Sequence, residues 1–319
     1  MRIMLAPMEG VVDHEMRTVL TQIGGYDRCV TEFIRVNDQL LPDKVFLRFA
    51  PELSQGGTTP NGTPVYLQLL GSNLKFMALN AQRAQKLEPK GIDLNFGCPS
   101  KTVNKNDGGS ALLREPDRIG NIVAAVRDSI DSQIPVTAKV RLGFSNHDLL
   151  EDVVGNIIES GANEICIHAR TREDRYKPPA YWSAVKKVTE SCPIPVIING
   201  EIWTIEEAKR ARQESGCEDI MLGRGALSCP DLAASIKACE TSSAYQFKSW
   251  AETLKTISDY LHQTENKHPK FVSNRAKQWL VFLQRQYPEA VELFHRIKRL
   301  READDVFAAI AERTQNKPN

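Results

Sequence analysis

The sequence predicts a (β/α)8 barrel followed by a small, all-helical C-terminal domain. Eight short apolar runs rich in β-forming residues recur over the first 240 residues, and most are followed by a segment with helical spacing of apolar residues. Strands that alternate with helices pair in parallel, and eight such units match the usual barrel length of about 250 residues. After Cys239 the strands stop and helical patterns alone continue.

The predicted strands are short, and most are separated by a predicted helix. They are Ile3–Met8, Cys29–Phe33, Pro64–Leu70, Gly91–Phe96, Val136–Leu142, Glu164–Ala169, Val196–Asn199 and Ile220–Leu222. A doubly wound parallel sheet is the alternative for such an alternation of strands and helices. No GxGxxG motif follows any of these strands, which disfavours a dinucleotide-binding fold of that kind.

The predicted helices of the barrel fill the spaces between strands. They are Asn73–Leu87, Pro116–Ser129, Leu149–Ser160, Ala180–Glu190, Thr204–Glu214 and Pro230–Cys239. Asn73, Thr204 and the region of Asp148 supply residues that commonly cap a helix N-terminus. These helices follow their strands in chain order, as a barrel requires.

The tail has apolar residues at intervals of three and four, which indicates amphipathic helices. These helices are expected over Tyr245–Thr264, Val272–Leu283, Glu289–Leu300 and Asp304–Arg313. The linker is expected at Thr241-Ser242-Ser243. We therefore predict a barrel domain over residues 1–241 and a helical domain over residues 242–319.

Composition limits the class of protein. The 319 residues are 41% apolar, enough for one large and one smaller domain. No apolar run approaches the roughly 20 residues that span a bilayer, and Pro7 and Glu9 interrupt the N-terminal run too soon for a signal peptide. Seven scattered cysteines without a CxxC pair favour reduced thiols over a disulfide frame or zinc site. We expect a cytoplasmic monomer without metal or membrane contact.

Positive charge is concentrated in the tail. The whole chain has 41 Lys and Arg against 40 Asp and Glu, but Lys270 to Arg301 contains eight basic and two acidic residues. Such a region can hold a polyanion such as nucleic acid. A solvated helical face is an equally good explanation from charge alone.

In barrel enzymes the active site lies at the carboxyl ends of the strands. Glycines follow the seventh and eighth predicted strands, as Asn199-Gly200-Glu201 and Gly223-Arg224. Turns at these two strand ends are the usual phosphate site of the fold, because backbone N–H groups can approach a phosphate there. Each glycine alone is explained by a tight turn, but together they favour a ligand that carries phosphate.

Lys139 and His168 lie within otherwise apolar strands. A charged side chain that faced the surrounding helices would be costly to bury, whereas at the top of the barrel axis it could meet a ligand. The alternatives are a structural ion pair for Lys139 and a histidine satisfied by backbone bonds for His168.

Cys98 differs from the other cysteines, whose default interpretation is as small buried apolar residues. It lies between Gly97 and Pro99, where a predicted strand ends and a loop that contains Gly108-Gly109 begins. With an ordinary pKa of about 8.5, a thiol is mostly protonated at neutral pH and can act as an acid. A thiolate could instead be a nucleophile. No Cys-His or Ser-His-Asp pattern is evident, which favours the acid.

Six segments resemble the tRNA-dihydrouridine synthases, flavoenzymes that reduce specific uridines of tRNA. In order they are APMEGVVD, LNFGCPSKTVNKNDGGSALL, KVRLG, HARTR, INGEI and GRGAL, and the segment around Cys98 is the most specific. The resemblance covers the whole chain. The long helical tail is most similar to the bacterial C-type enzymes, which act on uridine 16 of the D-loop.

The resemblance implies FMN as the bound cofactor and NADPH as the reductant, with Cys98 as the general acid that protonates C5 of uracil. It implies contacts with FMN from Pro7, Met8, Glu9, Gln68, Lys139, His168, Asn199, Gly200, Glu201, Gly223 and Arg224. Glu201 departs from the relatives, many of which have Gly or Asp there, so its carboxylate must point away from the phosphate or reach a ribityl hydroxyl.

The resemblance also implies tRNA as the partner. Asn95 and Arg141 would face the target uracil, with Arg35 and Tyr176 near the pocket. The helical domain would hold tRNA phosphates through Lys270, Arg275, Lys277, Arg296, Lys298 and Arg299.

Three other functions remain possible from the residues alone. They are a flavin barrel that reduces a free pyrimidine or other small molecule, an RNA-binding module without catalysis, and a phosphate-binding lyase that uses Lys139 as a Schiff base.

Overall fold

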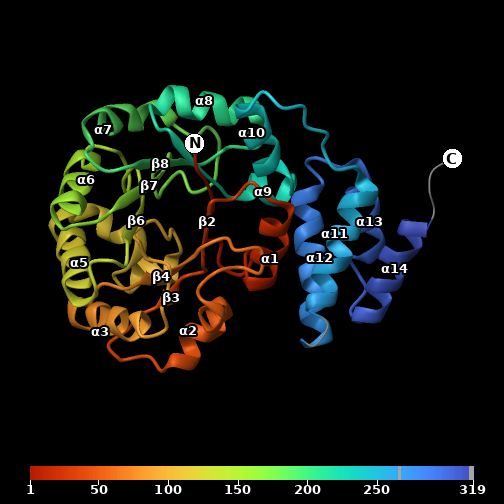
Figure 1. The fold of residues 1–319 in the computed structure, drawn as a ribbon, viewed down its shortest axis with the longest axis horizontal. Helices are drawn as coiled ribbons and strands as arrows, with labels where there is room; N and C mark the ends of the chain where they lie inside the picture. Colours follow the sequence, from red (N-terminus) through yellow and green to blue (C-terminus); the bar gives the residue numbers. More distant parts are fainter. Residues whose placement is uncertain (265–266, 316–319) are drawn as a thin grey trace.

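The computed structural model describes residues 1–264 and 267–315 and contains a closed parallel barrel, with the C-terminal helices on one side of it (Figure 1). The strand order is β2-β1-β9-β8-β7-β6-β5-β4-β3, and an additional pairing between β2 and β4 closes the ring. All of these pairings are parallel. The predicted (β/α)8 barrel is therefore confirmed, and the doubly wound sheet is excluded.

The strands are β1 (Ile3–Leu5), β2 (Arg28–Val30), β3 (Ile34–Arg35), β4 (Val65–Leu70), β5 (Ile92–Asn95), β6 (Val136–Arg141), β7 (Glu164–His168), β8 (Val196–Asn199) and β9 (Asp219–Leu222). The predicted second strand, Cys29–Phe33, has the wrong bounds, because β2 and β3 share one place in the barrel and both pair with β4. The N–H of Gln68 donates to the hydroxyl of Thr31 (3.0 Å), so a side chain enters the ladder between the two short strands.

The alternation of side chains along the strands separates two environments. In β6, Val136, Ala138 and Val140 belong to the large core that joins the strands to the surrounding helices. The residues between them face the barrel axis, and Lys139 and Arg141 reach a cavity there. In β6 the apolar residues therefore face outward and the polar residues inward, whereas other strands place apolar side chains such as Met4, Cys166 and Met221 on the inner face, in a separate buried cluster.

The amino ends of the strands are sealed by ion pairs. Arg28 pairs with Glu164 (2.7 Å), and Arg2 pairs with Asp219 (2.6 Å) and with Glu164. Arg28, Glu164 and Asp219 are buried, and a buried charge needs such a partner to be tolerated. The charges at this end are therefore satisfied within the protein.

The barrel helices are α1 (His14–Ile23), α2 (Asp43–Phe49), α3 (Leu74–Gln85), α4 (Lys101–Lys105), α5 (Pro116–Ser129), α6 (Leu150–Glu159), α7 (Lys186–Ser191), α8 (Ile205–Ser215), α9 (Arg224–Ser228) and α10 (Leu232–Glu240), with 3-10 turns at Pro51–Gln55, Gly109–Arg114 and Trp182–Val185. None of the helices in the described part of the chain combines the length and apolar character that crossing a membrane requires.

Two of the three predicted helix caps are confirmed. Asn73 accepts a hydrogen bond from the N–H of Phe76 (3.3 Å), and Thr204 accepts one from Glu207 (3.1 Å). The cap near Asp148 is wrong, because Leu149 occupies that position and makes no side-chain cap bond. The predicted helix Ala180–Glu190 is divided into a 3-10 turn and α7.

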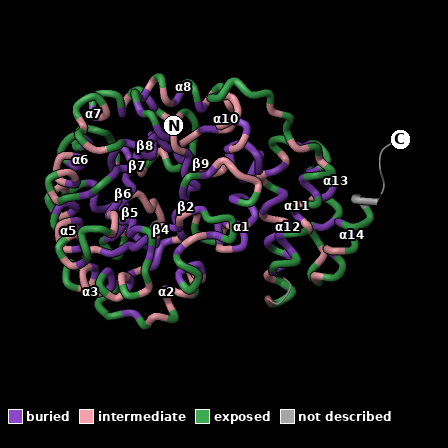
Figure 2. The backbone as a smooth tube through the Cα atoms, in the orientation of Figure 1, coloured by how far each residue is buried: buried purple, intermediate pink, exposed green. Residues whose placement is uncertain are grey.

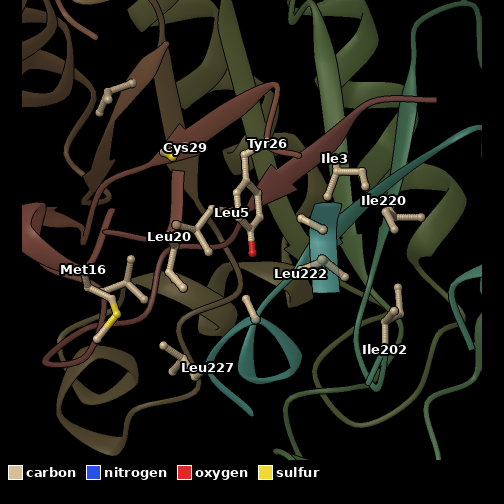
Figure 3. Close-up of a cluster of buried hydrophobic side chains, with 14 of the residues drawn as sticks. Ile3, Leu5, Met16, Leu20, Tyr26, Cys29, Ile202, Ile220, Leu222 and Leu227 are labelled. Atoms are coloured by element: carbon tan, nitrogen blue, oxygen red, sulfur yellow. The ribbon is translucent and has the colours of Figure 1, made fainter. Parts of the chain in front are cut away.

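The first helix packs on the barrel through large apolar side chains. Met16 and Leu20 of α1 lie in one buried cluster with Leu5 of β1 and Leu222 of β9 (Figure 3). Tyr26 inserts its ring into the same cluster. The buried residues follow the strands and the inner faces of the helices along the chain (Figure 2).

Four helices form the C-terminal part: α11 (Trp250–Gln263), α12 (Pro269–Leu283), α13 (Pro288–Ile297) and α14 (Ala303–Gln315). The first of them begins later than the predicted Tyr245, because Ser249 and Glu252 form a capping box. The predicted domain boundary at 241/242 lies between α10 and α11 and stays a prediction.

Helices α11 and α12 join the C-terminal helices to the barrel, with α11 against α1 and α12 against α9 (Figure 1). The indole N–H of Trp279 donates to the carbonyl of Leu227 (3.1 Å), and the ring is 2% exposed. The guanidinium of Arg275 pairs with Asp13 (2.8 Å) at the N-terminus of α1. This contact is both apolar and ionic.

Trp279→Ala should lower the free energy of unfolding by about 3–5 kcal/mol, the usual cost of removing a large buried aromatic side chain. Val281→Ala on the same helix is the control, because Val281 is 52% exposed and such substitutions change stability by less than about 0.5 kcal/mol. Urea titration of both variants measures this difference. Equal losses in the two variants would contradict the described packing.

Candidate active site

A cavity of about 710 Å³ opens at the carboxyl ends of the strands. This volume lies within the range of roughly 300–1,000 Å³ that is typical of small-molecule sites. Its wall comes from the barrel strands, their following loops and Phe282 of α12. The C-terminal helices therefore contribute to the cavity, which sequence reasoning did not anticipate.

The residues expected to contact a cofactor all line this one cavity. They are Pro7, Met8, Glu9, Gln68, Lys139, His168, Asn199, Gly200, Glu201, Gly223 and Arg224. Cys98 lines the cavity as well, as do three of the residues expected near the RNA base, Asn95, Arg141 and Tyr176. Arg35 lies at the end of β3 and is not among the lining residues.

Cys98 is half-buried and its backbone is held on both sides. Its N–H donates to the amide oxygen of Asn95 (2.5 Å), which also accepts the N–H of Gly97 (3.0 Å). Its carbonyl accepts the N–H (3.0 Å) and hydroxyl (2.9 Å) of Ser110 and the amide of Asn104 (3.0 Å). The backbone that carries the thiol thus has a fixed position at the cavity wall.

The glycine-rich segment after Cys98 packs directly against it. Gly109 has a φ of +59°, and a Cβ at this position would lie 2.7 Å from the carbonyl oxygen of Cys98. Both the backbone conformation and the close approach require glycine here. Gly109 therefore allows the tight return of the loop beneath the thiol.

Burial is the main reason why the pKa of the Cys98 thiol is raised, and the nearby charge of Glu9 raises it further. The N–H of Ser100 and the charges of Arg141 and Arg35 act in the opposite direction. The net shift keeps the thiol protonated at neutral pH. A protonated thiol can donate a proton, whereas a nucleophilic role would need the thiolate.

A chain of buried hydrogen bonds connects Asn95 with residues deeper in the barrel. Its amide donates to Gln68 (2.8 Å), and the amide of Gln68 donates to the carboxylate of Asp93 (2.7 Å), which also accepts the hydroxyl of Thr137 (2.5 Å). Burial raises the pKa of Asp93, while these hydrogen bonds oppose the rise. Asp93 was not predicted from the sequence, although a carboxylate within the apolar segment Ile92–Phe96 indicates a buried polar residue with a specific partner.

Lys139 is 9% exposed and points into the cavity. Its ammonium donates to the amide oxygen of Asn199 (3.0 Å), whose own amide donates to the carbonyl of Met221 (2.8 Å). Burial lowers the pKa of Lys139. Among the described residues it forms no ion pair, so the structural ion pair considered from the sequence is wrong.

His168 is buried against the same wall. Burial lowers its pKa well below the usual value, and the charges of Arg141 and Lys139 add to this effect, so the imidazole is neutral. Gly200 has a φ of +116°, and a Cβ there would lie 2.7 Å from Cδ2 of His168. Gly200 is therefore more than a turn residue, because a side chain would displace the imidazole.

Glu201 contacts three side chains from the segments that follow β7, β8 and β9. Its carboxylate pairs with Arg170 and with Arg224 (3.3 Å) and accepts the indole N–H of Trp203 (3.0 Å). Burial alone would raise the pKa of Glu201, but these partners hold it below its usual value. The carboxylate thus orients two guanidinium groups, an arrangement that neither expectation for Glu201 included.

The basic residues expected to hold RNA phosphates have different surroundings. Lys270, Lys298 and Arg299 are exposed, and Arg296 is exposed beside Glu312. Lys277 donates to the carbonyl of Leu300, and Arg275 is buried against the barrel. The role of each in RNA binding stays a prediction, and Arg275 has a clear structural role besides.

Solved structures with low sequence identity share the fold. A histamine dehydrogenase from Rhizobium superposes with a TM-score of 0.59 at 14% identity, over 82% of this chain and 48% of that chain. A 2-naphthoyl-CoA reductase superposes with a TM-score of 0.56 at 11% identity, over 76% of this chain and 50% of that one. At these identities the likeness concerns the fold alone.

Curated relatives match along the whole chain. The tRNA-dihydrouridine(16) synthase of Shewanella oneidensis is 48% identical over 320 residues, which covers 100% of both chains. That of Pseudomonas putida is 48% identical over 94% of this chain and 93% of its own. The sequence model of the dihydrouridine synthase family matches residues 4–316. The chain therefore belongs to the dihydrouridine synthase family.

Proposed function

We propose that this protein reduces a uridine of tRNA to dihydrouridine with a bound flavin mononucleotide and with NADPH as the reductant. The relatives that match over nearly their full length are named tRNA-dihydrouridine(16) synthases, so the uridine at position 16 of the D-loop is the proposed target. A soluble, cytoplasmic and monomeric enzyme is part of the same proposal.

The observation that carries the proposal is the pairing of an acid with a cation over one cavity. A protonated thiol, Cys98, and a buried ammonium, Lys139, line the same space at the carboxyl ends of the strands. Asn95 pairs in register with Lys139 in the sheet and holds the backbone of Cys98 through its amide oxygen. This set suits protonation of an electron-rich carbon on a bound ring.

The residues present fit a flavin mononucleotide. Lys139 brings a buried positive charge with a single neutral side-chain partner among the described residues, so an electron-rich ring edge would complete its contacts. Arg224 and the backbone at Gly200 and Gly223 line the end of the cavity that suits a phosphate. Met8 supplies an apolar wall close to Gly223.

A bound reduced flavin would supply the hydride that reaches C6 of uracil. Cys98 would donate the thiol proton to C5, and the resulting thiolate would regain a proton from water. Asn95 and Arg141 would orient the base, whose carbonyl oxygens can accept their hydrogen bonds. Lys139 would stabilise negative charge electrostatically in a site with little water. The uracil must leave the RNA stack to reach this cavity.

The C-terminal helices would hold the tRNA. Lys270, Lys298 and Arg299 are exposed there and can neutralise phosphates. NADPH needs no separate nucleotide-binding fold, because it can approach the flavin before the RNA binds.

The deciding experiment compares three substrates under NADPH: free uridine, unmodified tRNA, and tRNA with position 16 changed. Reduction of unmodified tRNA alone supports the proposal. Equal rates with free uridine would favour a small-molecule reductase. Purified protein without flavin absorption would contradict the cofactor assignment.

Cys98→Ala should leave flavin binding and flavin reduction by NADPH unchanged but lower the rate of tRNA reduction by about 10²–10⁴-fold, the usual contribution of a general acid. Stopped-flow measurement of the two half-reactions separates these effects. Cys192→Ala, which removes a partly buried thiol outside the cavity, is the matched control. Normal dihydrouridine formation by Cys98→Ala would rule out the acid role.

The pH dependence follows from the raised pKa of Cys98. The acid must be protonated, so the single-turnover rate with prereduced enzyme should stay flat up to the ordinary thiol pKa of about 8.5 and fall only above it. A rate that already declines between about pH 6 and 7.5 would contradict a buried thiol as the donor.

Lys270→Ala combined with Arg299→Ala should weaken tRNA binding and flatten its salt dependence. Each lost phosphate contact removes roughly 0.7–0.9 from the slope of log affinity against log salt. Lys186→Ala with Lys187→Ala removes the same charge from α7, on the side of the barrel away from the C-terminal helices (Figure 1). If both double variants bind tRNA alike, the helical surface is not the RNA site.

A further inference from the structure

A row of stacked guanidinium and aromatic groups connects the cavity with the C-terminal helices. The guanidinium of Arg224 lies 5.1 Å from the ring centre of Trp203, and that of Arg285 lies 4.1 Å from the same ring. Trp203 lines the cavity, whereas Arg285 follows the end of α12 and is not a lining residue. Such contacts favour a planar guanidinium over an ammonium.

The other edge of Trp203 is tied to the barrel. Its indole N–H donates to one oxygen of Glu201 (3.0 Å), and the other oxygen of that carboxylate pairs with Arg224 (3.3 Å) and with Arg170. The position of the indole therefore influences where Glu201 holds the two guanidinium groups. Arg285 lies at the outer end of this sequence of contacts.

Positive charge is in excess near Glu201, which favours binding of an anion. Arg170 and Arg224 pair with Glu201, and Arg285 lies over the neighbouring Trp203 ring. No carboxylate pairs with Arg285 among the described residues. Burial lowers the pKa of Arg224, and the charges of Arg170 and Arg285 lower it further. A phosphate dianion at this end of the cavity would complete the charge balance.

We propose that Arg285 is a positioning residue of the phosphate site. By stacking on Trp203 it fixes the indole, which orients Glu201, and Glu201 holds Arg224 toward the phosphate. The inference rests on the proposed function, because it takes the ligand to be flavin mononucleotide. It gives the C-terminal helices a part in cofactor binding that is separate from RNA binding.

The test is a comparison of FMN with riboflavin, which lacks the phosphate. Full-length protein freed of flavin is titrated with each, and flavin fluorescence gives the two dissociation constants. Arg285→Ala should weaken FMN binding by about three- to fivefold, as expected for one cation–aromatic contact, and change riboflavin binding by less than about twofold. Trp203→Phe, which keeps a ring but removes the bond to Glu201, should shift the same ratio.

Two variants serve as controls. Arg48→Ala removes an exposed guanidinium that lies 5.7 Å from the ring of Phe49, outside the cavity, and should change neither constant. Arg285→Lys keeps the charge but loses the planar stack, so it should resemble Arg285→Ala. Full recovery in Arg285→Lys would mean a direct charge contact and would overturn the positioning role.

The remaining outcomes separate the two proposals. If wild-type protein binds riboflavin as tightly as FMN, the phosphate-bearing cofactor of the proposed function is wrong. If wild type prefers FMN and Arg285→Ala keeps that preference, the inference is wrong. A loss confined to tRNA affinity and its salt slope would make Arg285 an RNA contact and would also overturn the inference.

Discussion

The buried ammonium of Lys139 is the constraint on which the site depends. The alternation of β6 turns this side chain to the barrel axis, where its pKa is lowered by burial and its described side-chain partner is the neutral amide of Asn199. A cation in that setting is costly unless a ligand with negative charge or carbonyl oxygens joins it. An electron-rich ligand in the cavity would offset this cost and would meet the other polar side chains that line the same wall.

The two ends of the barrel treat charge in opposite ways. At the amino ends Arg2, Arg28, Glu164 and Asp219 satisfy one another, so that end contributes rigidity and offers little to a ligand. At the carboxyl ends the cations exceed the carboxylates along the cavity wall. The amino end of the barrel is therefore neutralised by its own ion pairs, whereas the cavity at the carboxyl end has an excess of positive charge. The candidate site lies at the carboxyl end.

Sequence reasoning predicted the barrel and the inward residues of its strands, because strand alternation and the order of βα units are local in sequence. It missed Phe282, whose place in the cavity wall depends on how α12 packs against α9, and Trp203, whose indole is held by Glu201. It also could not show that Arg275 is buried against Asp13, a contact between residues more than 200 positions apart. Contacts between residues so far apart in the chain depend on the tertiary structure and leave no local pattern in the sequence.

The loop after β1 has a consequence for how such proteins can be recombined. Gly10 has its N–H held by Glu32 of the barrel and its carbonyl held by Arg275 and by Gln278 (2.9 Å) of α12. The loop next to Met8 at the edge of the cavity is therefore held by hydrogen bonds from both the barrel and the C-terminal helices. A chimera that exchanges C-terminal helices between relatives would have to exchange this loop with them, so the two parts are expected to diverge as one unit.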